Sequence, residues 1–469
     1  MALNDIIFEK TNGGMGRPAA NEDIISGLIM ALEGDLPYTD LEKVDKLTGE
    51  MIFETIGRVD DGDGINDGDL LYVAKLNYYE QLSTKYGIKA VEVKVPEEGE
   101  EKEDLSLSEK ACNTIDYHVR EFFRMSPTGI LYLAIRLGDE VSKKNIKDLQ
   151  YYAGGLLRQV GILTKTTDEH ETYQEACSEL FEEHQPLSVI MTYSGTKTEK
   201  STLNEELKDP NTGEPVLDPS TQAPLTTEVT VEERVPAEFL SKLTNKNEGL
   251  VLDDLSNVSV LVGCDLDPKL EERIGYFSDY GCIGTALGAI SKAAVHECIA
   301  WVQKFPLKLK QPGFITGELL KNVSMGDLDL INTNRYIFVR THVGNANNYF
   351  NDSHTLDVPT SDYAYIENVR TMDKATRGIR KNLLPYLNAP LYVDASTGNL
   401  RPDMVAFLET TAGRALEDME KAGELSGYIV VIDPAQNVLA TSELEVQIKQ
   451  VPVGVMRIVK IKIGYTTSI

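Results

Sequence analysis

The chain has 469 residues, 42% of them hydrophobic and 26% charged, so it can bury a sizeable core and is not disordered overall. Its 46 lysine and arginine residues against 74 aspartate and glutamate residues give a net charge of −28, which argues against broad nucleic-acid binding and against docking on an anionic membrane. Five scattered cysteines without CxxC spacing are typical of a reducing compartment.

The first residues predict a β arm. They contain a short apolar run made of Leu3, Ile6, Ile7 and Phe8. Three glycines and Pro18 follow this run and indicate a hinge. The run is too short to be the apolar core of a signal peptide. Residues 1–20 are therefore predicted to be an N-terminal arm with its hinge.

Residues 21–193 alternate helical and strand patterns, which predicts an α/β body. Apolar residues between Ile25 and Leu32 have helical spacing, and a second helix is expected to end before Pro127. The other expected elements are strands at 70–76 and 129–137 and a helix at 146–160.

A polar segment at 194–250 interrupts the body. Its first part, 194–229, is rich in threonine, glutamate, proline and aspartate and poor in large apolar residues. Such a composition gives a segment little reason to join the core. We predict a surface insertion or a mobile loop.

From residue 251 the core resumes and continues to the end of the chain. The patterns predict a strand at 258–262, a helix at 281–302, a strand at 334–341, helices at 362–384 and 402–421, and strands at 428–432, 444–448 and 453–463. The predicted fold class is α/β with a mixed-sheet core. Its later parts are a continuation of the body at 251–310, a C-terminal α/β domain at 311–450 and a C-terminal β arm at 451–469.

The apolar stretch at 282–302 is not predicted to span a membrane, because Lys292, His296 and Glu297 interrupt it. Gly281, Gly284 and Gly288 lie three and four residues apart and fit neither GxxxxGK[ST] nor GxGxxG. On a helix this spacing clears one face, so we predict close backbone packing there.

An acidic segment at 59–69 resembles a calcium loop but fails its spacing. Counted from Asp61, the fifth position is Ile65 and the sixth is Asn66, whereas an EF-hand requires an oxygen ligand and a glycine at these two positions. An irregular calcium site remains an alternative to an acidic turn. Its ligands would be Asp61, Asp63, Asp67 and Asp69.

Signals for catalysis are weak. His296 and Cys298 are two residues apart, so on a helix they point in different directions and do not form a nucleophile–base pair with each other. The chain contains no GxSxG, no HExxH and no zinc-finger spacing. No cofactor is predicted, and a cleft enzyme using Cys298 or His296 stays open as an alternative.

A cationic stripe marks the helix predicted at 362–384. Its members are Arg370, Lys374, Arg377 and Lys381, with Arg380 adding to the charge. The spacing of four, three and four residues places the first four on one helix face. The stripe is either a solvated face or a docking face for an acidic partner surface.

The C-terminus carries a second surface signal. From Val459 to Ile463, apolar and lysine residues alternate with period two, which predicts a strand with one apolar and one cationic face. Only a short segment follows, so pairing with a second subunit would cover the open edge of this strand. A last strand within the chain's own sheet is the alternative. The apolar residues assigned to strand exchange here are Val453, Val455, Val459, Ile461 and Ile463.

Several segments resemble contractile tail sheath proteins of bacteriophages and related contractile injection systems. They are 118–135 (HVREFFRMSPTGILYLAI), 257–267 (NVSVLVGCDLD), 283–302 (IGTALGAISKAAVHECIAWV), 363–388 (YAYIENVRTMDKATRGIRKNLLPYLN) and 427–464, which begins GYIVVIDPAQ. The resemblance covers most of the chain in order and is strongest from residue 257 to the end. None of these segments is a catalytic signature, and the polar insertion has no counterpart in the simplest sheaths.

The resemblance implies a structural role without enzymatic activity. Such a subunit polymerises helically around an inner tube, and its contraction drives the tube through a target envelope. The resemblance also implies that the arms at 3–10 and 453–463 exchange strands with neighbouring subunits, and that the domain at 311–450 faces the tube through the cationic stripe.

Implied partners are copies of the chain itself, the inner tube protein, and baseplate and terminator proteins, without nucleic acid or membrane insertion. Assembly would occur in the cytoplasm, before the subunit becomes part of a phage tail or contractile particle. Besides an enzyme, a tube or baseplate component of the same particle is an alternative.

Overall fold

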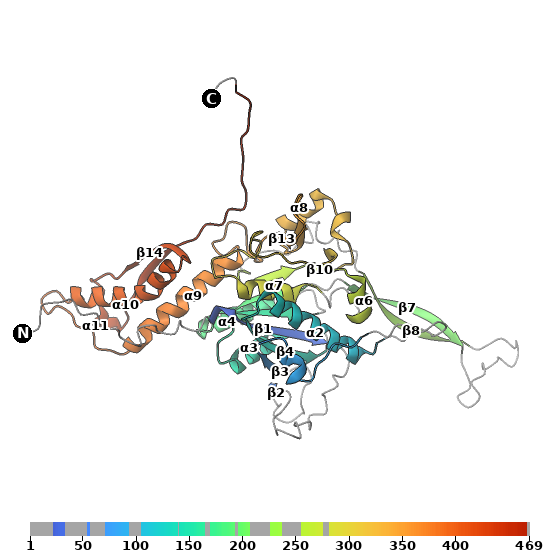
Figure 1. Ribbon diagram of the computed structural model, residues 1–469. Coiled ribbons are helices and arrows are strands. Elements are labelled where there is room, and N and C mark those ends of the chain that lie inside the picture. The colour runs from blue at the N-terminus through green and yellow to red at the C-terminus, as the bar shows by residue number, and fades with distance from the viewer. Residues whose placement is uncertain are drawn as a thin grey trace, which may run out of the picture.

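The computed structural model describes residues 22–32, 54–56, 71–92, 105–138, 140–164, 169–192, 196–206, 226–236, 255–274 and 281–466. A seven-stranded mixed sheet forms the centre of the body (Figure 1). In the order β2-β3-β4-β1-β5-β6-β9, the strands from β4 to β9 run parallel, and β3 and β2 continue the sheet antiparallel. The strands are β1 (Ile25–Leu32), β2 (Glu54–Ile56), β3 (Leu71–Leu76), β4 (Ile130–Leu137), β5 (Gln159–Leu163), β6 (Ser188–Thr192) and β9 (Val258–Leu261). This mixed sheet confirms the predicted fold class.

The segment Ile25–Leu32 is strand β1, so the helix predicted there is wrong. All of its residues are buried, and it pairs in parallel with β4 on one side and with β5 on the other. A strand covered on both faces reads as a nearly continuous apolar run. In a nearly continuous apolar run, residues at i, i+3 and i+4 are apolar in a strand as well as in a helix. The spacing therefore does not distinguish the two conformations.

Helices cover both faces of the sheet and divide its core into two clusters (Figure 1). Leu28 and Met30 of β1 pack with α2 (Leu107–Met125) and α7 (Ile283–Lys292), whereas Ile29 and Ala31 face the opposite side. That side is covered by α3 (Lys143–Tyr152) and α4 (His170–Glu182). A capping box between Ser106 and Glu109 begins α2, which ends before Pro127 as predicted. The helix expected at 146–160 ends earlier, because residues 159–163 form β5.

Helix α7 packs directly on the backbone of α2, as the glycine spacing predicts. A Cβ atom on Gly284 would lie 2.3 Å from the His118 carbonyl oxygen, and one on Gly288 would lie 2.6 Å from the Phe122 carbonyl oxygen. Gly281 precedes the helix and forms a β-bridge with Cys264. The helix ends at Lys292, well before the predicted residue 302.

We expect Gly284→Ala to lower the free energy of unfolding by about 1–3 kcal/mol, because the added methyl group forces α7 away from α2. This loss outweighs the gain of up to about 1 kcal/mol in helix propensity. The matched control is Gly326→Ala in α8 (Met325–Thr333), where the nearest atom to an added Cβ is 3.8 Å away. Thermal unfolding measures both. Equal midpoints for the two variants would contradict the close packing of α7 on α2.

Part of the polar insertion is an ordered ribbon. Strands β7 (Thr196–Glu206) and β8 (Thr226–Pro236) pair antiparallel and project from the body (Figure 1). The prediction of a surface insertion or a mobile loop did not include these two strands. Threonine and valine recur along them, and both residues favour strands even where no core is buried.

The body continues beyond residue 311, where the sequence predicts a domain boundary. Two small antiparallel sheets lie in this part of the chain, β10 (Gly263–Asp265) with β11 (Pro312–Phe314) and β12 (Val339–Thr341) with β13 (Asn348–Phe350). Phe314, Ile331, Phe338 and Leu356 belong to the same core cluster as one face of the central sheet. The strand expected at 334–341 is limited to β12.

A smaller unit follows, made of two helices packed on a two-stranded antiparallel sheet (Figure 1). Its elements are α9 (Ile366–Leu383), α10 (Pro402–Lys421), β14 (Leu425–Val431) and β15 (Gln447–Pro452). Both helices confirm predicted ones. The core of this unit contains Ala375, Leu416, Met419 and Leu425, together with Val295 from the body. Short helices complete the described chain: α1 (Gln81–Thr84), α6 (Pro268–Ile274), α11 (Val438–Thr441) and 3-10 turns at Glu22–Ile24, Leu320–Asn322 and Leu384–Tyr386.

All five cysteines are buried and unpaired. Burial raises the pKa of each thiol above its ordinary value. The residues are Cys112, Cys177, Cys264, Cys282 and Cys298.

Candidate assembly site

The C-terminal arm leaves the body as an extended segment (Figure 1). After β15 ends at Pro452, residues 453–466 form neither helix nor strand. The side chains of Ile458, Ile461 and Ile463 are 76%, 80% and 94% exposed. The strand predicted at 453–463 is thus not formed, because within the described chain no other strand pairs with it. From Ile458 onward its apolar residues instead face solvent.

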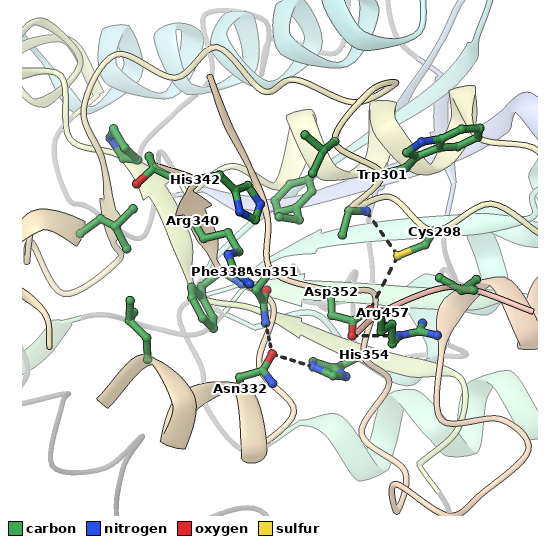
Figure 2. Close-up of a pocket in the computed structure, with 18 of the residues that line it drawn as sticks. Cys298, Trp301, Asn332, Phe338, Arg340, His342, Asn351, Asp352, His354 and Arg457 are labelled. Carbon is green, nitrogen blue, oxygen red and sulfur yellow. Dashed lines mark hydrogen bonds and ion pairs between the residues drawn. The ribbon is translucent and has the colours of Figure 1, made fainter. Parts of the chain in front are cut away.

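A cluster of charges surrounds Arg457 near the start of the arm; Figure 2 shows Arg457 beside Asp352. The Arg457 Nε atom donates to both carboxylate oxygens of Asp352 at 3.0 Å, and Nη2 donates to Glu367 Oε1 at 2.6 Å. The guanidinium carbon lies 3.5 Å from the ring centroid of Tyr365. Two carboxylates and one aromatic face therefore hold a single side chain, an arrangement that suits the planar guanidinium group.

The cluster contains a deeply buried carboxylate. Glu367 is 2% exposed and also accepts a hydrogen bond from Ser353 Oγ at 2.5 Å. Burial raises the pKa of Glu367, and Arg457 opposes that rise. For the cation Arg457, burial acts in the opposite direction and would lower its pKa. The carboxylates of Asp352 and Glu367 outweigh burial, so the pKa of Arg457 is raised. Arg457 is therefore charged, and it is the cation that pairs with the buried carboxyl group of Glu367.

The residues predicted to exchange strands separate into two groups. Val453 and Val455 are half-buried and lie against their own body, at a cavity of about 1390 Å³ that Trp301 and Phe338 also line. Ile458 reaches the edge of the same cavity but is 76% exposed. Val459, Ile461 and Ile463 lie beyond Arg457 and are exposed. The N-terminal residues assigned to the same role fall outside the described residues; they are Leu3, Ile6, Ile7 and Phe8.

Most of the predicted cationic stripe faces the chain itself. Arg370 is 4% exposed, and its Nη1 and Nη2 atoms each donate to the Ala293 carbonyl oxygen at 3.2 Å. Ala293 is the C-terminal cap of α7. A cation at this place satisfies carbonyl groups that the helix leaves open and matches the negative end of its dipole.

The next two cations bind Asp23, which lies just before β1. Lys374 Nζ is 2.8 Å from Asp23 Oδ2 and 2.7 Å from Glu424 Oε1, and Arg377 Nη2 is 2.8 Å from Asp23 Oδ1. Burial alone would raise the pKa of Asp23, but Lys374 and Arg377 outweigh it and hold that pKa below its ordinary value. These contacts join α9 to the residues just before β1, which are 354 positions away in the sequence from Arg377.

Three of the five predicted tube-binding residues are therefore used inside the chain, and the prediction of one continuous free stripe is wrong. The docking face for acidic groups exists, but its acidic partners are the chain's own Asp23 and Glu424. Arg380 and Lys381, at the C-terminal end of α9, are exposed.

The alternative of a cleft enzyme gains no support from the geometry. The hydrogen bonds of the Cys298 thiol go to Ser353 and Asp352, and not to His296. Burial, followed by the nearby Glu367 and Asp352 carboxylates, raises the pKa of Cys298 to about 12, so the nucleophilic thiolate is scarce at neutral pH. Among the described residues, no group of three histidine, cysteine or acidic side chains is placed to hold a metal ion. Asp61, Asp63, Asp67 and Asp69 lie outside those residues.

Sequence reasoning missed Arg457 and its acidic partners. A signal was present, because Arg457 is the single charged residue between Val451 and Val459. An isolated charge in an apolar run indicates a paired site, since such charges are seldom buried alone. Asp23 gave no comparable signal, because Arg377, its partner, is 354 positions away.

Comparison with known proteins gives family matches and a fold. Two family models match the chain: the DUF2586 N-terminal domain at residues 224–354 and the DUF2586 C-terminal domain at residues 362–469. No curated protein matches it.

Solved structures of contractile sheaths are similar to the chain over its full length. One is the helical sheath of the anti-feeding prophage in its contracted state, with 12% identity, complete coverage of both chains and a TM-score of 0.53. Another is the PVC sheath complex of an extracellular contractile injection system, also contracted, with 11% identity, coverage of 100% of this chain and 98% of the other, and a TM-score of 0.52. A chain from the anti-feeding prophage baseplate has 12% identity, covers 100% and 99%, and gives a TM-score of 0.50. At these identities the likeness is one of fold.

In the described ranges, no helix is both long enough and apolar enough to cross a membrane. The two DUF2586 domains together account for just over half of the sequence and lie in order along it. The chain therefore contains matches to both DUF2586 domains, and its fold is that of contractile sheath subunits.

Proposed function

We propose that the chain is the structural subunit of a contractile sheath. The observation that carries this proposal is the likeness in fold to contracted sheath proteins over the whole chain, including the exposed C-terminal arm. In a single subunit the arm buries little apolar surface, since its isoleucines are exposed to water. In a polymer it would cover these side chains and satisfy its backbone groups.

The site that receives an arm is proposed to be the sheet of β14 and β15. Among the described residues these strands pair only with each other, so each leaves one edge open. Ile429, Val431 and Val451 on this sheet are exposed. An extended arm from a second copy would add a strand to an open edge and cover apolar side chains at the same time.

In the proposed polymer the body forms the bulk of the wall, and the α9–β15 unit faces an inner tube. Contraction would drive this tube through a target envelope, with baseplate and terminator proteins at the two ends of the sheath. The subunit would assemble in the cytoplasm. For the contact between α9 and the tube we retain Arg380 and Lys381, because these two cations of the predicted stripe are exposed.

Electron microscopy of the purified full-length chain tests the proposal. We expect concentration-dependent assembly into long hollow helical polymers, which sediment and show a regular layer spacing. An engineered change that keeps the charge, Lys460→Arg, serves as a matched control and should polymerise equally. A chain that remains monomeric at every concentration and salt tested would overturn the proposal.

A further inference from the structure

The C-terminal arm has two parts with opposite properties. At its root, Arg457 makes three hydrogen bonds to Asp352 and Glu367 and stacks on Tyr365. Beyond it, the described residues from Ile458 to Tyr465 make no recorded hydrogen bond or ion pair, and their apolar side chains are exposed. The boundary between the two parts falls directly after Arg457.

We infer that Arg457 anchors the arm to its own subunit and that the segment exchanged with a second copy starts at Ile458. This inference rests on the proposed function, because it states which part of the arm a neighbouring subunit receives. The sequence alone would place all of 453–463 in the exchanged strand. The structure assigns Val453 and Val455 to the root and Val459, Ile461 and Ile463 to the exchanged tip.

The charges explain why the root stays in place. Glu367 is 2% exposed with Arg457 in place, and its other side-chain partner is the Ser353 hydroxyl. If Arg457 moved away with the arm, Glu367 would lose its paired cation and keep only that hydroxyl. Breaking a buried pair by removing one partner is strongly unfavourable, because the remaining charge is uncompensated. Moving the tip breaks no such contact. The least costly separation therefore keeps Arg457 on its own body and moves only the residues after it.

The chain before Arg457 is also fixed. Strand β15 is hydrogen-bonded to β14 up to Pro452, which pairs with Leu425. The root at 453–457 thus runs between two attachment points. From Arg457 to Thr466 the extended chain spans up to about 30 Å, which suits a contact with a directly adjacent subunit.

Limited proteolysis of the unpolymerised full-length chain with trypsin tests the anchor. Trypsin must bind the chain in extended form and insert the arginine or lysine side chain into its own pocket, so cleavage requires that this side chain be free. Three cleavage sites here are matched, because Arg457, Lys460 and Lys462 are each followed by isoleucine. Intact-mass spectrometry of the digest identifies the new C-terminus.

For the wild-type chain we expect products ending at Lys460 and Lys462 first, with cleavage after Arg457 slower by at least about ten-fold. Arg457→Lys keeps the charge and the trypsin site but loses the planar fork that binds Asp352 and Glu367, and cleavage after residue 457 should approach the rate after Lys460. The pair Asp352→Asn and Glu367→Gln should have the same effect from the other side of the cluster. Equal rates after Arg457 and Lys460 in the wild-type chain would overturn the inference. The assay uses unpolymerised protein, so it tests the Arg457 anchor even if the chain does not form a sheath.

Discussion

An Arg370→Glu variant is expected to lose about 3–5 kcal/mol of stability as an isolated chain, without any tube present. The wild-type guanidinium is buried and donates to the Ala293 carbonyl at the end of α7. A glutamate there would place a buried carboxylate against carbonyl oxygens and near Glu367, and the bonds to the Ala293 carbonyl would be lost. Urea unfolding followed by circular dichroism measures the change.

The matched control is Lys381→Glu on the same helix. Lys381 is exposed, so the same reversal of charge should change stability by no more than about 0.5 kcal/mol. The comparison distinguishes a basic residue that stabilises the fold from one that only lies on the surface. If Arg370→Glu unfolds at the wild-type urea concentration, Arg370 does not stabilise the contact between α9 and the body. The stripe would then return to a surface role.

A chain that ends at Arg457 is expected to fold normally and to lose polymerisation. The deletion removes the exposed tip but keeps β15 and the anchor, so the thermal unfolding midpoint of the monomer should not change. In the polymer, each backbone hydrogen bond of an added strand contributes about 0.5–1.5 kcal/mol net, and several are lost at every subunit contact. Sedimentation and electron microscopy measure the assembled fraction.

A chain ending at Thr466 is the control for shortening as such, because it keeps every tip residue that the structure describes. It should polymerise as the full-length chain does. Long hollow polymers from the chain ending at Arg457 would refute strand exchange through the tip. Polymers lost together with a lowered unfolding midpoint would instead show that the tip supports the fold of its own subunit.

The sequence predicted well those elements whose signals are local. Helix α2 has a capping box and a proline after its end, and α10 has a long apolar stripe. The strand at 258–261 is a short apolar run with two valines. These features depend on residues a few positions apart, so the sequence displays them directly.

The failures have a common physical cause, because they depend on partners far away in the sequence. Strand β1 takes its conformation from the sheet on both sides, and its apolar run fits either period. The positions of Arg370, Lys374 and Arg377 were recognised as one helix face, but their partners lie far away in the sequence. Arg370 binds the Ala293 carbonyl oxygen, and the other two bind Asp23 and Glu424. The spacing of charges defines a face, and the tertiary fold decides what covers it.

The burial of all five thiols has a consequence for the proposed polymer. Thiolate is the form that attacks disulfides and reacts with peroxide, and the raised pKa values keep its fraction small at neutral pH. If the chain forms a sheath, its subunits would enter an oxidising medium with no exposed thiol among the five cysteines, and their contacts would stay non-covalent.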